Sequence, residues 1–212
     1  MAKIAFLGLG VMGYPMAGHL QAAKQDVTVY NRTTAKAEKW VAEHGGAFAA
    51  TPAESVSGAE VVFACVGNDN DLRSITTGEG GAFAAMASGT VFVDNTTASA
   101  EVARELYGLA QAAGFNFIDA PVSGGQAGAE NGALTVMCGG DAAPYARVEP
   151  LIDAFSKSCR LMGDSGAGQL TKMVNQICIA GLLQGLSEGM HFAQKAGLDG
   201  KAVVDVISKG AA

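Results

Sequence analysis

The sequence predicts an α/β protein in which a doubly wound, mostly parallel β-sheet is followed by a smaller helical domain. Short apolar runs alternate with helical patterns through most of the 212 residues, as they do in parallel sheets that helices cover on both faces. The pattern changes after Met162, where a glycine-rich loop, residues 163–168, leads into one long helical stretch. We therefore expect a sheet domain over residues 1–163 and the start of an all-helical domain over residues 164–212.

Short apolar runs are expected to form the strands, and helical patterns separate them. The expected strands lie near residues 3–7, 27–30, 47–49, 60–65, 90–93, 116–118, 134–138 and 159–162. The expected helices of the sheet domain lie near residues 11–24, 33–44, 52–57, 70–76, 98–113 and 142–156. The third helix follows a capping box, Thr51-Pro52-Ala53-Glu54, with proline at the first helical position. The fifth has an apolar face, because Ala103, Leu106 and Ala110 recur at helical spacing.

The helical domain is expected to hold a long helix from Gln169 to about residue 196 and a shorter one near residues 200–208. The residues from Leu170 to Leu186 are mostly apolar all round, which is typical of a buried helix. With fewer than fifty residues, this domain is small for an independent core. We expect it to pack against the first domain, against a second subunit in a homo-oligomer, or against residues beyond this sequence.

Composition excludes several classes of function. A formal net charge of −6 argues against nucleic acid as a partner. The most apolar later stretch, Ile177 to Leu186, is too short to span a bilayer, and the first strand begins too close to Met1 for a signal peptide. The four cysteines form no C-x-x-C pair, and the three histidines lie at no metal-ligand spacing. We therefore expect a cytoplasmic protein with buried thiols, no metal site and no membrane partner.

The first strand runs directly into a glycine-rich turn, Gly8-Leu9-Gly10-Val11-Met12-Gly13, and an apolar helix follows. This is a G-x-G-x-x-G motif between a strand and a helix, the setting that dinucleotide binding requires. Gly8 permits a tight turn, Gly10 leaves room for a pyrophosphate, and Gly13 lets the helix approach the strand. The helix directs free N–H groups at the phosphates. The motif predicts a Rossmann-like domain that binds a dinucleotide, and the alternative is a glycine-rich turn without a ligand.

The end of the second strand indicates which dinucleotide is bound. An NAD site usually places a carboxylate there, which binds the ribose 2′-hydroxyl. This chain has Asn31-Arg32-Thr33 instead, and Asp26 lies at the other end of the strand. The Arg32 guanidinium can attract a 2′-phosphate and stack on adenine. We therefore expect NADP to be preferred, with NAD still possible. The alternative is that Arg32 is a solvated residue beside the next helix.

A polar, glycine-rich segment, Asp119–Gly125, follows another strand. The N–H groups near Gly124 and Gly125, together with the Ser123 hydroxyl, can form a concavity that binds an anion. A substrate carboxylate would fit there. The alternative is an ordinary loop at the exit of a strand, which needs glycine for its turns.

Lys172 interrupts the apolar pattern at the start of the long helix. Asn175 and Gln176 lie three and four residues further on, so they share its helical face. Three polar side chains on one face of a buried helix require partners or a cavity. Lys172 can therefore face a substrate oxygen, and the alternative is a lysine whose amine reaches water from a helix end.

The glycine-rich turn, the segment 119–125 and the run 166–176 together resemble the β-hydroxyacid dehydrogenase family, in this order along the whole chain. That family includes 3-hydroxyisobutyrate dehydrogenase, tartronate semialdehyde reductase and the glyoxylate/succinic semialdehyde reductases. The resemblance implies that Lys172 is the catalytic lysine and that Ser123, Gly124 and Gly125 hold a substrate carboxylate. It also implies that Thr96 and the segment Val66-Gly67-Asn68 contact the cofactor.

The chain departs from the family pattern in two places. The family usually has an asparagine four residues after the lysine, whereas here that residue is Gln176 and Asn175 precedes it. Both are candidates for substrate binding. Family members also continue for several more helices, which close the active site, whereas this chain stops at Ala212. The expectation is that the chain is either naturally truncated or a piece of a longer protein.

The expected reaction is reversible hydride transfer between NADP(H) and a small β-hydroxy acid or its semialdehyde, with Lys172 as the proton donor. Two alternatives stay open, namely imine reduction, which similar folds perform, and a non-catalytic dinucleotide-binding scaffold. The lysine favours a carbonyl substrate over an imine. The intact Ser123–Gly125 segment together with Lys172 argues against a scaffold.

Overall fold

The structure is a computed structural model that describes residues 1–210. It divides into two compact units, Met1–Lys172 and the residues from Met173 onward. The sequence suggested a boundary near Asp164, before the long helix. That domain boundary stays a prediction, and the two compact units divide inside the helix, because its first turn is bound to the sheet by hydrogen bonds from Gly166 and Gln169.

The first unit is built on one mixed, mostly parallel sheet, whose strands are described in chain order. They are β1 (Lys3–Leu7), β2 (Asp26–Tyr30), β3 (Ala47–Phe48), β4 (Val61–Ala64), β5 (Val91–Asp94), β6 (Asn116–Asp119), β7 (Val122–Ser123), β8 (Leu134–Gly139) and β9 (Ser156–Gly163). The order β3-β2-β1-β4-β5-β6 is parallel throughout, which is the strand order of a dinucleotide-binding sheet. Strand β8 runs antiparallel to β6 and β7, and β9 runs parallel to β8.

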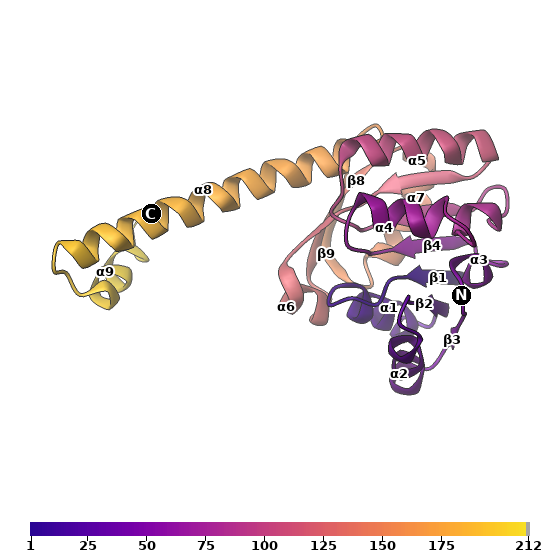
Figure 1. Cartoon of the computed structure of the whole chain (residues 1–212), viewed down its shortest axis with the longest axis horizontal. Helices are drawn as coiled ribbons and strands as arrows, with labels where there is room; N and C mark the ends of the chain where they lie inside the picture. Colours follow the sequence, from indigo (N-terminus) through magenta and orange to yellow (C-terminus); the bar gives the residue numbers. More distant parts are fainter. Residues whose placement is uncertain (211–212) are drawn as a thin grey trace. The chain divides into compact units, whose positions relative to one another are not determined.

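Helices lie between the strands, as the alternating pattern predicts. They are α1 (Gly13–Ala22), α2 (Thr34–His44), α3 (Pro52–Ser55), α4 (Asp69–Thr76), the 3₁₀ turn η1 (Ala82–Ala84), α5 (Ala100–Ala113), α6 (Gly125–Glu130) and α7 (Ala142–Ile152). One half of the predicted capping box forms, because the Thr51 side chain accepts a hydrogen bond from the Glu54 N–H, whereas the Glu54 carboxylate accepts from the Ala50 N–H. Figure 1 shows α5 and the α1–α2 pair on opposite sides of the sheet.

Each central strand buries both of its faces, one in each of two hydrophobic cores. In β1, Ile4 and Phe6 face a core with α1 and α2, whereas Ala5 and Leu7 face a core with α5. Strand β4 alternates in the same way. Such burial on both sides explains why the strands read as continuous apolar runs. Because these strands run parallel, their carboxyl ends lie together at one edge of the sheet.

Three elements were not expected from the sequence. The segment 119–125, expected to be a loop, contains β7, whose Val122 and Ser123 pair with Val136 and Thr135 of β8, and it leads directly into α6. The turn η1 follows α4. Helix α7 ends at Ile152 rather than near residue 156, since Ser156 already belongs to β9.

The second unit contains the remainder of α8 (Ala167–Lys195) and the short helix α9 (Gly200–Ile207). Within residues 1–210 the long helix is largely exposed, with Ile177, Leu182 and Phe192 at 71%, 66% and 71%, so its expected burial against a partner stays a prediction. Cys178 is also exposed, unlike the buried thiol that was expected. These apolar side chains have no core of their own within a unit of this size. No helix in residues 1–210 combines the length and apolar character that crossing a membrane requires.

Candidate functional site

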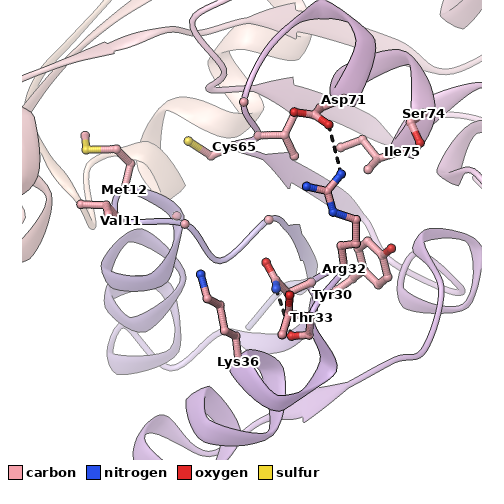
Figure 2. Close-up of a pocket in the computed structure, with 16 residues that line it drawn as sticks. Val11, Met12, Tyr30, Arg32, Thr33, Lys36, Cys65, Asp71, Ser74 and Ile75 are labelled. Atoms are coloured by element: carbon pink, nitrogen blue, oxygen red, sulfur yellow. Dashed lines mark hydrogen bonds and ion pairs between the residues drawn. The ribbon is translucent and has the colours of Figure 1, made fainter.

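A cleft lies at the carboxyl ends of β1, β2 and β4, where the strand order reverses. Ligands of doubly wound sheets bind at such a switch point. Figure 2 shows residues from three segments around the cleft: the turn after β1, the end of β2 with the start of α2, and the loop after β4 with α4. Its lining residues are Gly8, Gly10, Val11, Met12, Gly13, Tyr30, Asn31, Arg32, Thr33, Lys36, Cys65, Val66, Gly67, Asp71, Ser74 and Ile75.

The turn after β1 has the geometry of a phosphate cradle. Gly8 adopts φ +97°, and a Cβ there would collide with the Cys65 carbonyl oxygen. A Cβ on Gly13 would collide with the Gly8 carbonyl, so the start of α1 lies directly on the turn. Gly10, in contrast, has open space where its Cβ would be. No side chain caps α1 at its N-cap residue, Met12, and a helix start of this kind binds anions.

Two cationic side chains and one carboxylate line the cleft near the end of β2. Arg32 Nη1 lies 3.3 Å from Asp71 Oδ1, and the Arg32 side chain is 86% exposed. Lys36 comes from the first turns of α2, and Figure 2 shows its amine pointing toward the glycine-rich turn. The Asp71 carboxylate also accepts a hydrogen bond from Asn68 Nδ2 at 3.2 Å. The cations therefore outnumber the carboxylates here, which favours an anion.

The loop after β5 connects the cleft to the interior of the sheet. The Thr96 hydroxyl accepts a hydrogen bond from the Val66 N–H, and the Thr96 N–H donates to Asp94 Oδ1. Asp94 is fully buried, and its Oδ2 has no partner in residues 1–210. Burial raises the pKa of Asp94 to about 7, and the nearby Asp119 carboxylate adds to this effect. Asp94 therefore holds the Thr96 backbone in place, although burial disfavours the charged form of its own carboxyl group.

The start of α8 is attached to the sheet through Asp119, the last residue of β6. Asp119 Oδ1 accepts from the Gly166 N–H at 2.7 Å, and Oδ2 accepts from the Gln169 N–H at 2.9 Å. The Gln169 side chain donates to the Thr96 carbonyl at 2.7 Å and accepts from the Ala98 N–H. This glutamine thus joins the helix to the loop beside the cleft. A carboxylate at a helix start also complements the helix dipole.

Lys172 lies one turn after Gln169 and is only 8% exposed. Burial lowers the pKa of its ammonium below the usual 10.5, because water no longer solvates the charge fully. Its ammonium forms no ion pair in the part of the chain that the structure describes. A buried amine of this kind can donate a proton more readily than a solvated one.

Two family models match the chain: the NAD binding domain of 6-phosphogluconate dehydrogenase over residues 3–163, and the NAD-binding domain of NADP-dependent 3-hydroxyisobutyrate dehydrogenase over residues 166–212. An uncharacterized oxidoreductase of Shewanella frigidimarina is 61% identical over all of this chain and 73% of its own length. The 3-hydroxyisobutyrate dehydrogenase of Pseudomonas aeruginosa is 35% identical over 99% of this chain and 70% of its own. The chain belongs to the β-hydroxyacid dehydrogenase family.

A solved structure of this family supports the same assignment. The 3-hydroxyisobutyrate dehydrogenase of Mycobacterium tuberculosis, solved with L-serine, superimposes with a TM-score of 0.91 at 34% identity. The alignment covers 99% of this chain and 71% of that one. Plant relatives at 40–43% identity carry mitochondrial names, so a cytoplasmic location stays a prediction.

The structure brings together most of the residues that the family motif suggests for the cofactor, except for Leu9, Asn68 and Thr96. Leu9 buries its side chain in the core and donates its N–H to Asn31 Oδ1. Asn68 caps α4 through the N–H groups of Asn70 and Asp71. Thr96 is buried behind Val66. None of these three residues lines the cleft itself.

The family's substrate-binding candidates lie in two units. Ser123 ends β7, and Gly124 and Gly125 begin α6 with φ values of +135° and +62°. Both glycines adopt backbone conformations that side chains rarely allow. Asn175 and Gln176 belong to the second unit, where the Asn175 side chain donates to Gln176 Oε1 at 3.3 Å.

Sequence reasoning missed Lys36 and Asp71 as members of the cleft. The position of Lys36 in the first turns of the helix after the second strand is the signal that could have found it. Asp71 comes from α4 and meets Arg32 only in three dimensions, so no local pattern indicates it. Within residues 1–210 there is no group of three metal-ligating side chains.

Proposed function

We propose that this chain provides the cofactor site and the catalytic lysine of an NADPH-dependent oxidoreductase that acts on small hydroxy acids and their semialdehydes. The observation that carries the proposal is Lys172. As a whole residue it is only 8% exposed, its ammonium lacks an ion-pair partner in the described residues, and it lies one turn after the glutamine that binds the Thr96 loop. A structural lysine at a helix end would instead extend to water.

The preference for NADP rests on the charges at the end of the second strand. Arg32 and Lys36 line the cleft where an adenine ribose would lie, and a 2′-phosphate would contact both cations. The carboxylate that would favour the 2′-hydroxyl of NAD is missing after the second strand, where Asn31 and Arg32 stand instead. Asp71 is the only acid in the cleft lining of the described residues, and it already pairs with Arg32.

The substrate carboxylate is proposed to bind at Ser123, Gly124 and Gly125. Ser123 is half-buried and Gly125 is exposed, and the backbone turns sharply at both glycines. Consecutive N–H groups in such a turn form an anion-binding concavity. Asn175 and Gln176 are proposed as further substrate contacts, since both follow Lys172 on α8.

The chemistry divides between the cofactor and the chain. When bound, the nicotinamide ring supplies or accepts the hydride. In the reductive direction the substrate carbonyl oxygen gains negative charge, and the Lys172 ammonium stabilises that charge and donates the proton. At about 3 Å and an effective dielectric constant of ~20, the Coulomb attraction is roughly 5 kcal/mol. The Asp119 and Gln169 contacts hold the helix that carries this amine.

Self-association through the helical unit is part of the proposal. Helices α8 and α9 expose large apolar side chains, including Ile177, Leu182 and Val206. Apolar surface of this extent is typical of an interaction site. A second copy of the chain would cover it, and sedimentation measurements over a range of protein concentrations test this point.

Two measurements on the purified chain test the enzymatic proposal. Fluorescence titration with NADPH and NADH determines which cofactor binds, and absorbance of the reduced nicotinamide reports turnover with semialdehydes, glyoxylate and cyclic imines. We expect tighter binding of NADPH and turnover of a carboxylate-bearing aldehyde. Equal affinity for both cofactors refutes the NADP preference. Turnover of imines alone supports an imine reductase, and binding without any turnover supports a non-catalytic scaffold.

A further inference from the structure

Two cysteines that the proposed reaction does not use lie against each other in the sheet. Cys138 is in β8 and Cys159 is in the neighbouring parallel strand β9. The strand register pairs Val136 with Cys159 and Cys138 with Leu161, so the two cysteines occupy diagonal positions on one face. Their sulfur atoms are 3.6 Å apart. A disulfide bond is about 2.05 Å long, so closing this gap requires rotation of both side chains and a shift of the two strands toward each other at these diagonal positions.

The two thiols differ in access to solvent and in charge. Cys138 is fully buried in the core, whereas Cys159 is only half-buried at its edge. The hydrogen-bonded contact with Cys138 lowers the pKa of Cys159, against the opposing effects of burial and of the Glu149 and Asp153 carboxylates. The contact with Cys159 raises the pKa of Cys138, and its burial adds to this effect. Cys159 is therefore the more nucleophilic sulfur, and Cys138 is the protonated neighbour.

We propose that Cys138 and Cys159 form a peroxide-reactive dithiol, in which Cys159 is the attacking cysteine and Cys138 the resolving one. An accessible, thiolate-prone sulfur beside a second thiol is the arrangement that redox-sensitive sites use. The other two cysteines lack it. Burial raises the pKa of Cys65 to about 12, and the structure records no sulfur contact for Cys178 within residues 1–210.

The reaction consumes one molecule of a hydroperoxide, here hydrogen peroxide. The Cys159 sulfur attacks one peroxide oxygen, so that an S–O bond forms, the O–O bond breaks and the second oxygen leaves as water after taking up a proton. The Cys138 sulfur then attacks the Cys159 sulfenic acid. The S–S bond forms, the S–O bond breaks, and the hydroxyl leaves as water with the proton of Cys138. The two thiols lose two electrons, and the peroxide is reduced to water.

The disulfide would join β8 to β9, the strand that leads to α8. Strand β9 ends at Gly163, whose carbonyl accepts a hydrogen bond from the Gly140 N–H just beyond β8. The closed ring includes α7 and Tyr145. The proposal does not depend on the proposed enzymatic function, because its test requires neither cofactor nor substrate.

The test is peptide mapping of the purified full chain after treatment with one equivalent of hydrogen peroxide and alkylation of the remaining thiols. Trypsin releases Cys138 in the peptide 105–147 and Cys159 in the tripeptide 158–160. We expect these two peptides to be joined, the number of alkylated cysteines to fall from four to two, and dithiothreitol to reverse both changes. The Cys178→Ser control should give the same joined peptide. In the wild-type chain, absence of the joined peptide at a peroxide dose that oxidises Cys178 overturns the proposal.

Two variants separate the roles of the sulfurs. Cys138→Ala should stop at the sulfenic acid of Cys159, which dimedone labels, because no resolving thiol remains. Cys159→Ala should leave Cys138 reduced and unlabelled, since that thiol is buried. Labelling of Cys138 in the Cys159→Ala variant, or of Cys178 alone in the Cys138→Ala variant, contradicts the assignment. Both variants remove a sulfur without placing a polar group in the core, so a folded protein is expected.

Discussion

The carboxylate of Asp119, at the end of β6, accepts a hydrogen bond from the backbone N–H of Gln169 at 2.9 Å. This contact fixes the start of α8 against the sheet one turn before Lys172. Glycine at position 168 is required for it, because a Cβ there would collide with the Asp119 and Met137 carbonyl oxygens. The position of Lys172 therefore depends on Asp119, a sheet residue more than forty positions earlier in the chain.

Replacing Asp119 by alanine should destabilise the first unit. The Gly166 and Gln169 N–H groups would lose their acceptor while remaining buried, at a cost of about 2–4 kcal/mol in the free energy of unfolding. Urea unfolding measures this loss. Asp153→Ala is the matched control, since Asp153 is exposed and its carboxylate accepts no recorded hydrogen bond in the described residues. Similar stability of the two variants would show that Asp119 does not anchor the helix.

Replacing Lys172 by alanine should lower kcat by about 10²–10³-fold, since removing one such donor costs about 3–4 kcal/mol of barrier. NADPH affinity should stay nearly unchanged, because Lys172 is not among the residues that line the nucleotide cleft. Lys172→Arg should fail as well, because guanidinium scarcely releases its proton. Steady-state kinetics and cofactor titration check both variants. Near-normal turnover of Lys172→Ala would exclude the catalytic role.

The lowered pKa of Lys172 also predicts a pH dependence of the wild-type reaction. Reduction requires the protonated amine, so kcat should decline at alkaline pH with an apparent pKa below 10.5. The pH profile of kcat measures that value. The residual activity of Lys172→Ala should lack this decline, and a profile shared by both proteins would assign the titration to another group.

Arg32→Ala and Lys36→Ala should each weaken NADPH binding about tenfold and leave NADH binding unchanged, because both cations are proposed to contact only the 2′-phosphate. Asp71→Asn should strengthen NADPH binding, since it removes the competing carboxylate 3.3 Å from Arg32. Titration of each variant with both cofactors measures the effects. Lys39→Ala is the control, because that exposed lysine pairs with Glu43 on α2. An equal loss for NADH would locate Arg32 and Lys36 elsewhere on the cofactor.

Asp94 predicts how folding stability changes with pH. Its pKa is about 7 in the folded protein against the usual 3.8, so the folded state binds its proton more tightly than the unfolded chain does. The free energy of unfolding should therefore fall as pH rises from about 4 to about 7. Between about pH 5 and about pH 8, the free energy of unfolding of Asp94→Asn should fall by on the order of 2–3 kcal/mol less than that of the wild type. Urea unfolding at both pH values measures the difference, and parallel curves would contradict it.

Local patterns in the sequence predicted the parallel part of the fold well. The turn at residues 8–13 has backbone requirements that only glycine satisfies, so it could be located without any tertiary information. The apolar runs of β1 and β4 are continuous because both faces are buried. Strand β7 was missed, since a pairing of two residues with β8 is fixed by distant contacts rather than by propensity.

The candidate site was predictable only where its residues follow strand ends. Arg32 could be placed in the cleft in this way, because parallel strands end at one edge of the sheet, whereas Val66 was assigned to the cofactor site through the family resemblance. The pairing of Asp71 with Arg32 and that of Cys138 with Cys159 join residues from separate elements. A single amino-acid sequence carries no signal of such contacts. The exposure of Ile177 was also unpredictable, since an apolar pattern indicates burial but not by which partner.

The contact between Gly13 and the Gly8 carbonyl has a consequence for affinity. Helix α1 rests on the turn through atoms of the chain itself, so the cradle has its shape before any nucleotide arrives. The loop is already ordered in the folded protein, so binding of a pyrophosphate does not carry the entropic cost of ordering it. Substitutions that loosen this one contact should therefore weaken every dinucleotide alike, whichever phosphate or hydroxyl its ribose carries.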